Sequence, residues 1–391
     1  MQYRKDKHGN ELSILGFGCM RFIRGLTGID YAKAEKEIMH GIDVGINYFD
    51  TAYVYPGSEV LLGEVLSKNN ARDKIKIATK LPHYLTKNID DVNKIFDEEL
   101  KRLKTDHIDY YLMHMINDEE SWNRLVKMGI IKWIEDKKKS GEIRQVGFSY
   151  HGNSDNFIKL LDAYDFDFCQ IQYNYLDINT QAGVTGLKHA ASKNIPVIIM
   201  EPLQGGRLAN NIPRDAKNII KEKMNMEPAE FGLRWLYNQK EVTVVLSGMN
   251  SIEMIDENVN TASKVRVNEI TEDEFKIYEE VSGIINEKVK VKCTGCRYCM
   301  PCPHNVDIPG TFAAYNNYYT AGKFNGIKSY MMCTEFRKNV TSPKNCVECK
   351  LCEKHCPQHI EISKELKNAR RVLEFPFYGI ICKVIKEFMK Y

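Results

Sequence analysis

The segment Asp43-Val-Gly-Ile-Asn-Tyr-Phe-Asp-Thr-Ala52 contains a short apolar run, Asn47–Asp50, which directly follows a helical stretch from Tyr31 to Val44. A helical period followed by a short buried run is typical of βα units and a parallel sheet. The same alternation continues in both directions from this segment. Eight runs are predicted as strands: Ile14–Cys19, Asn47–Asp50, Lys76–Lys80, Ile108–His114, Gln145–Ser149, Phe168–Gln172, Val197–Glu201 and Val242–Leu246.

The stretches between these runs have the period of helices. Those predicted as helices include Tyr31–Val44, Ile89–Leu103, Trp122–Lys138, Pro228–Tyr237 and Ser251–Ala262. Eight βα repeats in about 250 residues predict an α/β fold, a (β/α)8 TIM barrel. An open doubly wound sheet has similar local signals, but no Gly-x-Gly-x-x-Gly turn follows an early strand to support it.

A hairpin and one more helix flank the predicted barrel. The hairpin is expected around His8-Gly9-Asn10. The run Thr271-Glu-Asp-Glu274 predicts the cap of a helix that continues to Ile285. We therefore expect the barrel domain to cover residues 1–286.

The composition is that of a soluble globular protein, with 391 residues of which 43% are hydrophobic and 27% charged. This length allows one large domain and a smaller one. The N-terminus is charged and no long apolar run follows it, so neither a signal peptide nor a first membrane span is expected. The predicted compartment is the cytoplasm.

Eight of the 12 cysteines lie in two short runs with regular spacing, which favours metal thiolates over disulfides. The second run, Cys346-x2-Cys349-x2-Cys352-x3-Cys356-Pro357, matches the bacterial ferredoxin pattern. The first run, Cys293-x2-Cys296-x2-Cys299-x2-Cys302-Pro303, is one residue shorter before its last cysteine. Structural zinc is the alternative, but a third cysteine at the same step and the Cys-Pro ending favour 4Fe–4S clusters.

Two clusters are expected in this module. If the two runs exchange their last cysteine as two-cluster ferredoxins do, Cys293, Cys296, Cys299 and Cys356 hold one cluster, and Cys346, Cys349, Cys352 and Cys302 hold the other. The remaining cysteines are expected to be buried hydrophobes: Cys19, Cys169, Cys333 and Cys382.

Positive charge is concentrated in the C-terminal part of the chain. Residues 287–391 contain 18 Lys and Arg against 9 Asp and Glu, a formal charge of +9. Basic surface is common in nucleic-acid-binding proteins. Thiolate-bound clusters would add negative charge to this same region, so a nucleic-acid partner is not expected.

Polar residues end three successive predicted strands: Asp50, Lys80 and His114. In TIM barrels the chemistry lies at this end of the strands, and Tyr55 lies in the loop just after Asp50. A buried ammonium beside the phenol would lower the phenol's pKa from about 10 and let it give a proton to a carbonyl oxygen. Taken singly, each residue also has a structural explanation, such as a helix cap or a buried histidine.

Several segments carry a resemblance to the aldo-keto reductase superfamily over residues 1–286. They are Gly16–Arg21, Asp43–Ala52, Tyr55 with Gly57–Glu59, Ala78–Lys80, Asp109–His114, Gly141–Ser149 and Gln170–Gln172. The resemblance implies that Tyr55 is the general acid, that Lys80 tunes it, that Asp50 holds Lys80, and that His114 orients the carbonyl.

The resemblance also implies a nicotinamide site. Ser149 and Gln170 would bind the carboxamide, and Gly18, Cys19 and Met20 would lie beside the ribose. The segment that would cover the pyrophosphate contains Pro202, Leu203, Gly205, Gly206 and Arg207. The remaining cofactor contacts would come from Met200, Gly248, Met254, Glu257 and Asn258.

The sequence departs from the family pattern at three places. Tyr150 follows the carboxamide-binding serine where many members have Asn, and Met200 replaces an aromatic ring that usually stacks on the nicotinamide. The run Ser247–Met254 lacks the Lys and Arg that typically bind the 2′-phosphate of NADP. The choice between NAD and NADP is therefore open.

The combination of barrel and cysteine runs resembles a bacterial and archaeal group of ferredoxin-tailed aldo-keto reductases, which extends the likeness to residue 373. It implies reduction of a small carbonyl compound, an aldehyde, ketone or quinone, and a possible redox partner such as ferredoxin. The alternative is an electron-transfer protein whose barrel holds another cofactor or serves as a scaffold. Hydride carries two electrons and a cluster accepts one, so no direct relay is implied.

The iron–sulfur module is expected over residues 287–373 and a separate helix over residues 374–391. At about 100° per residue, the charged residues of this tail share one arc: Lys383, Lys386, Glu387 and Lys390. The opposite arc has Phe377, Ile381, Val384, Ile385 and Phe388. We expect this apolar face to dock on the chain itself, with a subunit interface or a membrane surface as alternatives.

Overall fold

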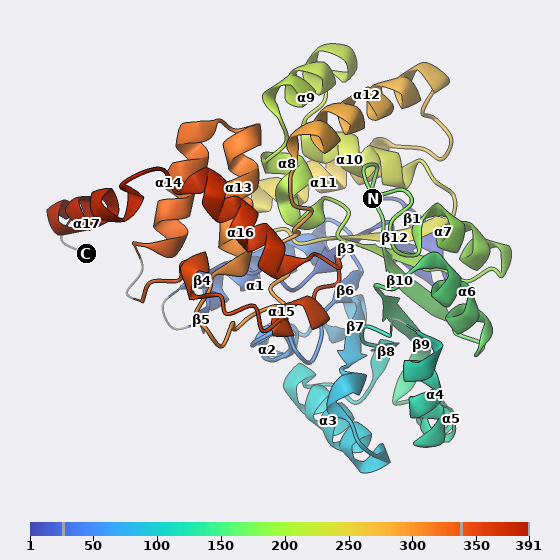
Figure 1. Ribbon diagram of the computed structural model, residues 1–391. Coiled ribbons are helices and arrows are strands. Elements are labelled where there is room, and N and C mark those ends of the chain that lie inside the picture. The colour runs from blue at the N-terminus through green and yellow to red at the C-terminus, as the bar shows by residue number, and fades with distance from the viewer. Residues whose placement is uncertain (26–27, 117, 337–338, 390–391) are drawn as a thin grey trace. The chain divides into compact units, whose positions relative to one another are not determined.

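The computed structural model describes residues 1–25, 28–116, 118–336 and 339–389 (Figure 1). The chain divides into two compact units. The first contains Met1–Pro202 and Ala229–Ile270, and the second contains Leu203–Pro228 and Thr271–Tyr391. These units are defined by contacts between residues, and the domain boundary near Glu287 stays a prediction.

The first unit contains a closed barrel of eight parallel strands, which confirms the predicted fold class. Every predicted strand is present, with its bounds shifted by at most two residues. The strands are β3 (Leu15–Gly18), β6 (Tyr48–Asp50), β7 (Lys76–Leu81), β8 (Ile108–Met113), β9 (Ile143–Tyr150), β10 (Phe168–Gln172), β11 (Val197–Met200) and β12 (Val242–Ser247).

Side chains from alternate positions fill the barrel interior. Tyr110 is central in this core, with its ring centroid 5.0 Å from that of Tyr48 and 5.2 Å from that of Phe168, both in edge-to-face contact. The core also contains Leu12, Ala78, Leu112, Ile198, Val244 and Leu246. The barrel is therefore a packed core, and its chemistry must lie at its ends.

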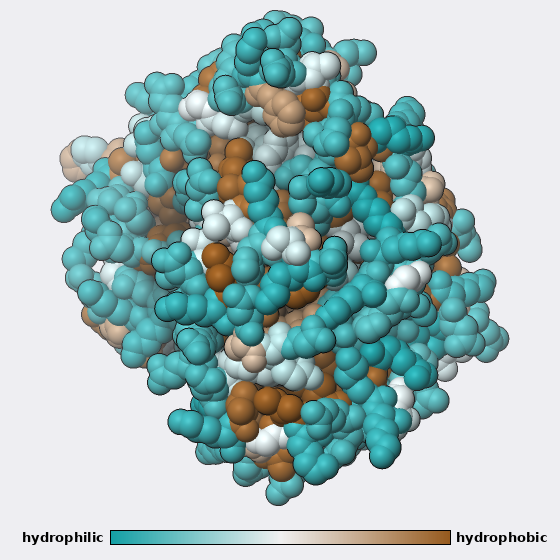
Figure 2. All heavy atoms as spheres, turned by 90° about the vertical axis from the view of Figure 1, so that its right-hand side faces the viewer, coloured by the Kyte–Doolittle hydropathy of each residue, from teal (hydrophilic) through white to brown (hydrophobic). Residues whose placement is uncertain are grey.

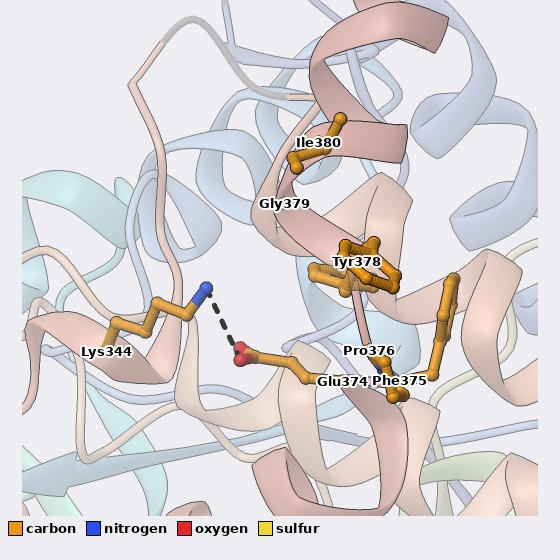
Figure 3. A pocket seen from close by; sticks show the side chains of 8 residues that line it. Lys344, Glu374, Phe375, Pro376, Tyr378, Gly379 and Ile380 are labelled. Carbon is orange, nitrogen blue, oxygen red and sulfur yellow. Dashed lines mark ion pairs between the residues drawn. The ribbon is translucent and has the colours of Figure 1, made fainter.

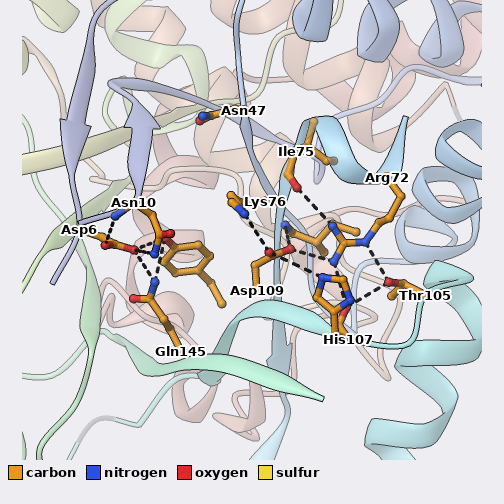
Figure 4. Close-up of polar contacts among 12 residues, drawn as sticks. Asp6, Asn10, Asn47, Arg72, Ile75, Lys76, Thr105, His107, Asp109 and Gln145 are labelled. Atoms are coloured by element: carbon orange, nitrogen blue, oxygen red, sulfur yellow. Dashed lines mark hydrogen bonds and ion pairs between the residues drawn. The ribbon is translucent and has the colours of Figure 1, made fainter. Parts of the chain in front are cut away.

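The predicted hairpin is present as the antiparallel strands β1 (Tyr3–Lys5) and β2 (Glu11–Ser13). The hairpin loop places Asp6 against the barrel, where its carboxylate accepts hydrogen bonds from Tyr110, at 2.6 Å, and from Gln145 (Figure 4). These contacts attach the hairpin to the barrel away from the carboxyl ends of the strands. This arrangement fits a structural role, which is usual for this end of a TIM barrel.

Helices surround the strands in the first unit, and one predicted helix is wrong. The stretch Trp122–Lys138 forms two helices, because Gly129 has a φ of 92° and interrupts the helical backbone. The helices and short strands of this unit are β4 (Arg24–Gly25), β5 (Gly28–Ile29), α1 (Tyr31–Asp43), α2 (Ser58–Lys68), α3 (Ile89–Leu103), α4 (Glu119–Lys127), α5 (Ile130–Ser140), α6 (Ser154–Asp162), α7 (Gly183–Ser192), α10 (Pro228–Tyr237) and α11 (Ile252–Lys264).

The described part of the second unit contains helices and no strand. The predicted Thr271 cap is present, because the Thr271 and Glu274 side chains bond reciprocally to each other's backbone N–H groups. The helices are α8 (Arg207–Asn210), α9 (Arg214–Ile219), α12 (Glu272–Lys288), α13 (Ile308–Thr320), α14 (Lys323–Thr334), α15 (Leu351–Lys354), α16 (Ile362–Leu373) and α17 (Tyr378–Met389).

The last helix, α17, contacts the rest of its unit through Tyr378 and Cys382, which are 2% and 3% exposed. The Tyr378 ring lies 5.7 Å from that of Tyr330. Beside it, the turn before the helix opens on a cavity of about 610 Å³ next to the Lys344–Glu374 ion pair (Figure 3).

Three of the five residues of the predicted docking face of α17 are exposed, whereas Ile385 is half-buried. Phe377, Ile381 and Val384 are 74%, 38% and 46% exposed. Tyr378 and Cys382, one helical turn apart, form the buried seam instead, at the edge of the predicted face. The side chains of Lys383, Lys386, Glu387, Phe388 and Lys390 lie outside the described residues.

Hydrophobic side chains occur in small groups on the face of the molecule in Figure 2, which is otherwise largely hydrophilic. Within the residues that the structure describes, no helix has the length and apolar character needed to cross a membrane.

Candidate functional site

A buried ion pair lies at the carboxyl end of the barrel. Asp50 is the last residue of β6, and Lys80 lies near the end of the neighbouring strand β7. The Lys80 Nζ donates to Asp50 Oδ1 at 2.6 Å and to the carbonyl oxygen of Thr51 at 2.7 Å. Because both side chains are almost fully buried, at 1% and 6% exposure, their charges act strongly on whatever lies beside them.

Tyr55 and His114 lie next to this pair. The Lys80 Nζ is 5.3 Å from the centroid of the Tyr55 ring. The rings of Tyr55 and His114 meet edge to face, with centroids 6.2 Å apart and planes at 85°. The structure therefore brings together the four residues that the sequence singled out.

The loop that contains Tyr55 is fixed at both ends. Ser58, at the start of α2, donates to the carbonyl oxygen of Cys19 at 2.8 Å, and its hydroxyl lies 2.8 Å from that of Thr51. Gly57 has a φ of 74°, a backbone conformation that favours glycine. These contacts fix the loop that carries Tyr55.

Glu59, the last residue of the Gly57-Ser-Glu59 motif, has a structural role. Its carboxylate, 1% exposed, accepts hydrogen bonds from Thr79 at 2.6 Å and from Arg102 at 3.1 Å. Burial raises the pKa of Glu59, although the hydrogen bonds from Thr79 and Arg102 act in the opposite direction. Glu59 thus ties α2 to β7 and α3, the elements around Lys80.

His114 is neutral in this environment. Burial lowers the pKa of His114 well below its ordinary value, and the nearby Lys80, His151 and His83 act in the same direction. Burial also lowers the pKa of His83 to about 4. A neutral imidazole has one N–H donor, which is what a carbonyl oxygen can accept.

Gln170 has a partner that the sequence did not indicate. Its Nε2 donates to Asp50 Oδ2 at 2.8 Å, so Asp50 is held by Lys80 on one oxygen and by Gln170 on the other. Gln170 is paired in register with Ser149 on the neighbouring strand. The Ser149 Oγ accepts from the backbone N–H of Met115 at 2.9 Å.

We predict that Gln170→Met lowers the stability of the barrel by about 1.5–3 kcal/mol, the range for a lost hydrogen bond to a charged group. Among the described residues, Lys80 then remains as the one side-chain partner of the buried Asp50. Urea unfolding followed by circular dichroism, compared with Gln239→Met in the half-buried turn after α10, measures the loss. Equal stability of the two variants would contradict the holding role of Gln170.

The other residues predicted for a nicotinamide site are divided between the two units. Cys19 is buried and its backbone N–H donates to the Asp50 carbonyl oxygen at 2.8 Å. Asn258 donates to Ser247 at 3.1 Å, and the aliphatic stem of Arg21 lies against Gly248. Those in the first unit also include Gly18, Met20, Met200, Pro202, Met254 and Glu257. Those in the second unit are Leu203, Gly205, Gly206 and Arg207.

Four cysteines of the two runs line one small cavity in the second unit: Cys293, Cys296, Cys299 and Cys356. Cys356 comes from the second run and the other three from the first. Apolar side chains close the cavity, among them Ile308, Pro309, Phe312 and Ile360. Four thiols around one apolar cavity match the donor set of a four-iron cluster.

Cys302 and Cys346 of the other set lie near Cys352. Burial, Glu353, Cys302 and Cys346 raise the pKa of Cys352 to about 11. Burial likewise raises the pKa of Cys299, together with Cys293, Cys296, Cys356 and Cys352. Thiols in such surroundings ionise when they bind metal, because the cation stabilises the thiolate.

The described residues contain no group of three or more His, Cys, Asp and Glu side chains that could hold a metal ion. A cubane cluster binds its thiolates at four separate iron atoms, so its ligands do not have to meet at one point. The cavity lined by four cysteines therefore fits a cluster better than a single ion.

Two side chains fix the segments that carry the cysteines. Asn316 on α13 accepts from the backbone N–H of Val291 at 3.0 Å and donates to its carbonyl oxygen at 2.6 Å, just before the first run. Glu353 accepts from the N–H and the hydroxyl of Ser363 at 2.9 and 2.8 Å. The module is thus organised around both runs.

The chain has a barrel with a buried lysine–carboxylate pair beside a tyrosine, and a cluster-binding module follows it in the sequence. Together these features define a class of barrel oxidoreductases. The model of the aldo/keto reductase family matches residues 14–282, and that of the 4Fe–4S dicluster domain matches residues 292–361. The chain belongs to the aldo/keto reductase family and carries a 4Fe–4S dicluster domain after the barrel in the sequence.

Known proteins are similar to the barrel part. A probable aldo-keto reductase of Glycine max is 27% identical, over 70% of this chain and 86% of its own, and the NADH-specific methylglyoxal reductase of Escherichia coli is 24% identical, over 55% and 78%. Among solved structures, an aldo-keto reductase from Bacillus halodurans in its holo form has a TM-score of 0.60 and 23% identity, covering 72% of this chain and 96% of its own.

A second solved structure is an aldo/keto reductase from Klebsiella pneumoniae in complex with NADP and acetate. Its TM-score is 0.58 at 20% identity, and the match covers 71% of this chain and 94% of that one. At sequence identities of 23% and 20%, the similarity to these solved structures shows the fold of the chain alone.

Proposed function

We propose that the protein reduces a small carbonyl compound, an aldehyde, ketone or quinone, with NAD(P)H. The observation that carries this proposal is the buried Asp50–Lys80 pair, with Lys80 Nζ 2.6 Å from the carboxylate and 5.3 Å from the Tyr55 ring. Burying a charged pair in the protein interior costs free energy. Its position beside a tyrosine therefore indicates a functional role for the pair.

The four residues have distinct roles in this proposal. Tyr55 gives its phenolic proton to the carbonyl oxygen, and the positive charge of Lys80 stabilises the phenolate that results. Asp50 orients Lys80 through the 2.6 Å contact. His114, neutral because of its burial and its cationic neighbour Lys80, donates a hydrogen bond to the same carbonyl oxygen.

The residues predicted for the nicotinamide carboxamide fit a primary amide. The Ser149 hydroxyl already accepts from Met115, so its own proton can be donated to the amide oxygen. The Nε2 of Gln170 is used by Asp50, which leaves its Oε1 to accept from the amide nitrogen. When bound, a reduced nicotinamide supplies the hydride that these side chains alone lack.

The test is the consumption of NADH and NADPH with an activated aldehyde and a quinone. Turnover with either coenzyme supports the reductase. The alternative, an electron-transfer protein with the barrel as scaffold, is tested by following cluster absorbance during anaerobic titration with the same coenzymes. Cluster reduction by NAD(P)H without any carbonyl turnover would favour that alternative.

We predict that NADP is not strongly preferred over NAD. Gly248 and Met254 supply no cation to a 2′-phosphate, and Arg21, whose stem lies against Gly248, is the cation to examine there. The expected ratio of kcat/KM values for NADPH and NADH is below about a hundredfold, or about 2.7 kcal/mol. A larger ratio that disappears in Arg21→Ala would overturn this prediction and assign the phosphate contact to Arg21.

A further inference from the structure

The helix α17 leaves several of its apolar side chains uncovered. Ile380, Ile381 and Val384 are 61%, 38% and 46% exposed, and Phe377, the residue just before the helix, is 74% exposed. A group of large apolar side chains left in water is typical of an interaction site, because its exposure costs free energy. We call these four residues the α17 stripe.

The four residues of the stripe belong to one surface. At about 100° per residue, Ile380, Ile381 and Val384 fall within an arc of about 100° around the helix. Phe377 lies one turn before them, because its carbonyl oxygen accepts from the backbone N–H groups of Ile380 and Ile381 at 2.9 and 3.0 Å. Phe377 and Ile380 also line the same cavity of about 610 Å³, which is shown in Figure 3. The stripe is therefore continuous with this cavity.

The stripe lies away from the side of α17 that packs on its own unit. That side contains the buried residues Tyr378 and Cys382, and the centre of the stripe is about 130° from it around the helix. Glu335 lies near Tyr378 and Cys382, so its charge is on the packed side. One side thus attaches the helix to its unit, and changes on the other side leave that attachment in place.

The segment that contains the stripe is positively charged. Residues 375–391 have one acid, Glu387, and three lysines, which are Lys383, Lys386 and Lys390. Glu374, just before this segment, is paired with Arg370 at 3.0 Å and with Lys344 at 3.3 Å. The charge of Glu374 is therefore compensated locally, and the segment keeps a formal charge of +2.

A membrane surface fits the stripe better than a second protein does. Four side chains cover far less than the roughly 800 Å² per partner of a standard protein interface. Insertion between lipid headgroups needs only a small apolar area with positive charge close to it. With 12 residues, α17 is too short to cross a bilayer and would lie along its surface. We propose that the α17 stripe attaches the protein to the surface of an anionic lipid bilayer.

The charges and the apolar side chains have separate roles in this attachment. The lysines attract the protein to anionic headgroups over roughly one Debye length, about 10 Å at 0.1 M salt. The apolar side chains then enter the boundary between headgroups and acyl chains, where binding strengthens with the apolar area that leaves water. Phe377 and Ile380 are the most exposed members of the stripe, so they contribute most to this step.

The experiment is cosedimentation of the full-length protein, with its clusters, and lipid vesicles. The vesicles contain phosphatidylcholine alone or with about one third phosphatidylglycerol, at about 50 and about 300 mM NaCl. Binding to the anionic vesicles is expected to be at least tenfold tighter than to the neutral ones at low salt. Phe377→Ser/Ile380→Ser is expected to raise the Kd at least tenfold at both salt concentrations. Lys383→Gln/Lys386→Gln should raise it about tenfold at low salt only.

Matched controls lie at the start of α14 in the same unit. Phe324→Ser removes an aromatic side chain that is 78% exposed, and Lys323→Gln removes an exposed charge. Both should leave vesicle binding within about twofold of the wild type. Iron content and circular dichroism must equal those of the wild type in every variant. Failure of the full-length protein to sediment with anionic vesicles, or equal effects of the test and control variants, would overturn the attachment.

A second copy of the chain is the other occupant that the measurements distinguish. If sedimentation velocity shows a wild-type dimer that Phe377→Ser/Ile380→Ser converts to a monomer, and no vesicles are bound, the stripe is a subunit interface and the membrane proposal is refuted. The outcome is independent of the proposed function, because vesicle binding is measured without coenzyme or carbonyl compound.

Discussion

Tyr55→Phe is expected to reduce carbonyl turnover about 10²- to 10⁴-fold, the usual contribution of a positioned general acid. Only the hydroxyl is removed, and contacts of Ser58 with Thr51 and Cys19 fix the loop that carries Tyr55. The fold and nicotinamide binding should therefore be retained. Activity is measured with an activated aldehyde, and coenzyme binding by quenching of intrinsic fluorescence.

Tyr53→Phe is the matched control for this variant. Tyr53 lies in the same loop, and its ring faces the guanidinium of Arg102 at 4.2 Å. The control loses the same hydroxyl and should keep its activity within a few-fold. Turnover of Tyr55→Phe at the level of the control would refute the role of Tyr55 as proton donor.

The strands of the barrel could be predicted from the sequence because buried parallel strands are short apolar runs with helical stretches between them. The break at Gly129 could not, because the apolar period continues across it and only the backbone conformation reveals the turn. The same limit applies to α17. Periodicity defined its apolar arc, but it could not show that Tyr378 and Cys382, at the edge of that arc, are the residues that pack.

Asp50, Lys80 and His114 could be predicted because they end successive strands, and the ends of neighbouring parallel strands meet. The hydrogen bond from Gln170 to Asp50 could not be predicted, because it joins residues 120 positions apart across the barrel. The same holds for His83 and His151, which act on His114 through space. Their position just after strand ends was the only signal in the sequence.

Replacing Cys356 provides the sharpest test of the cluster module. The anaerobically prepared protein is expected to contain about eight irons and eight sulfides per chain. Cys356 lines the same cavity as Cys293, Cys296 and Cys299, although about 55 residues separate it from the first run. Cys356→Ala should therefore remove about four irons, and the iron lost should be that of the first run.

The assignment of the lost cluster follows from double variants. If Cys356 and Cys299 ligate one cluster, Cys299→Ala/Cys356→Ala should lose no more iron than either single variant, whereas Cys349→Ala/Cys356→Ala should lose nearly all of it, because the two changes then affect different clusters. Cys333→Ala, a buried cysteine outside both runs, is the control and should keep about eight irons. The opposite pattern, with additive loss for Cys299 and Cys356, would mean that each run holds its own cluster. Stoichiometric zinc in place of iron would refute both arrangements, because the cavity would then hold a single ion with four thiolates.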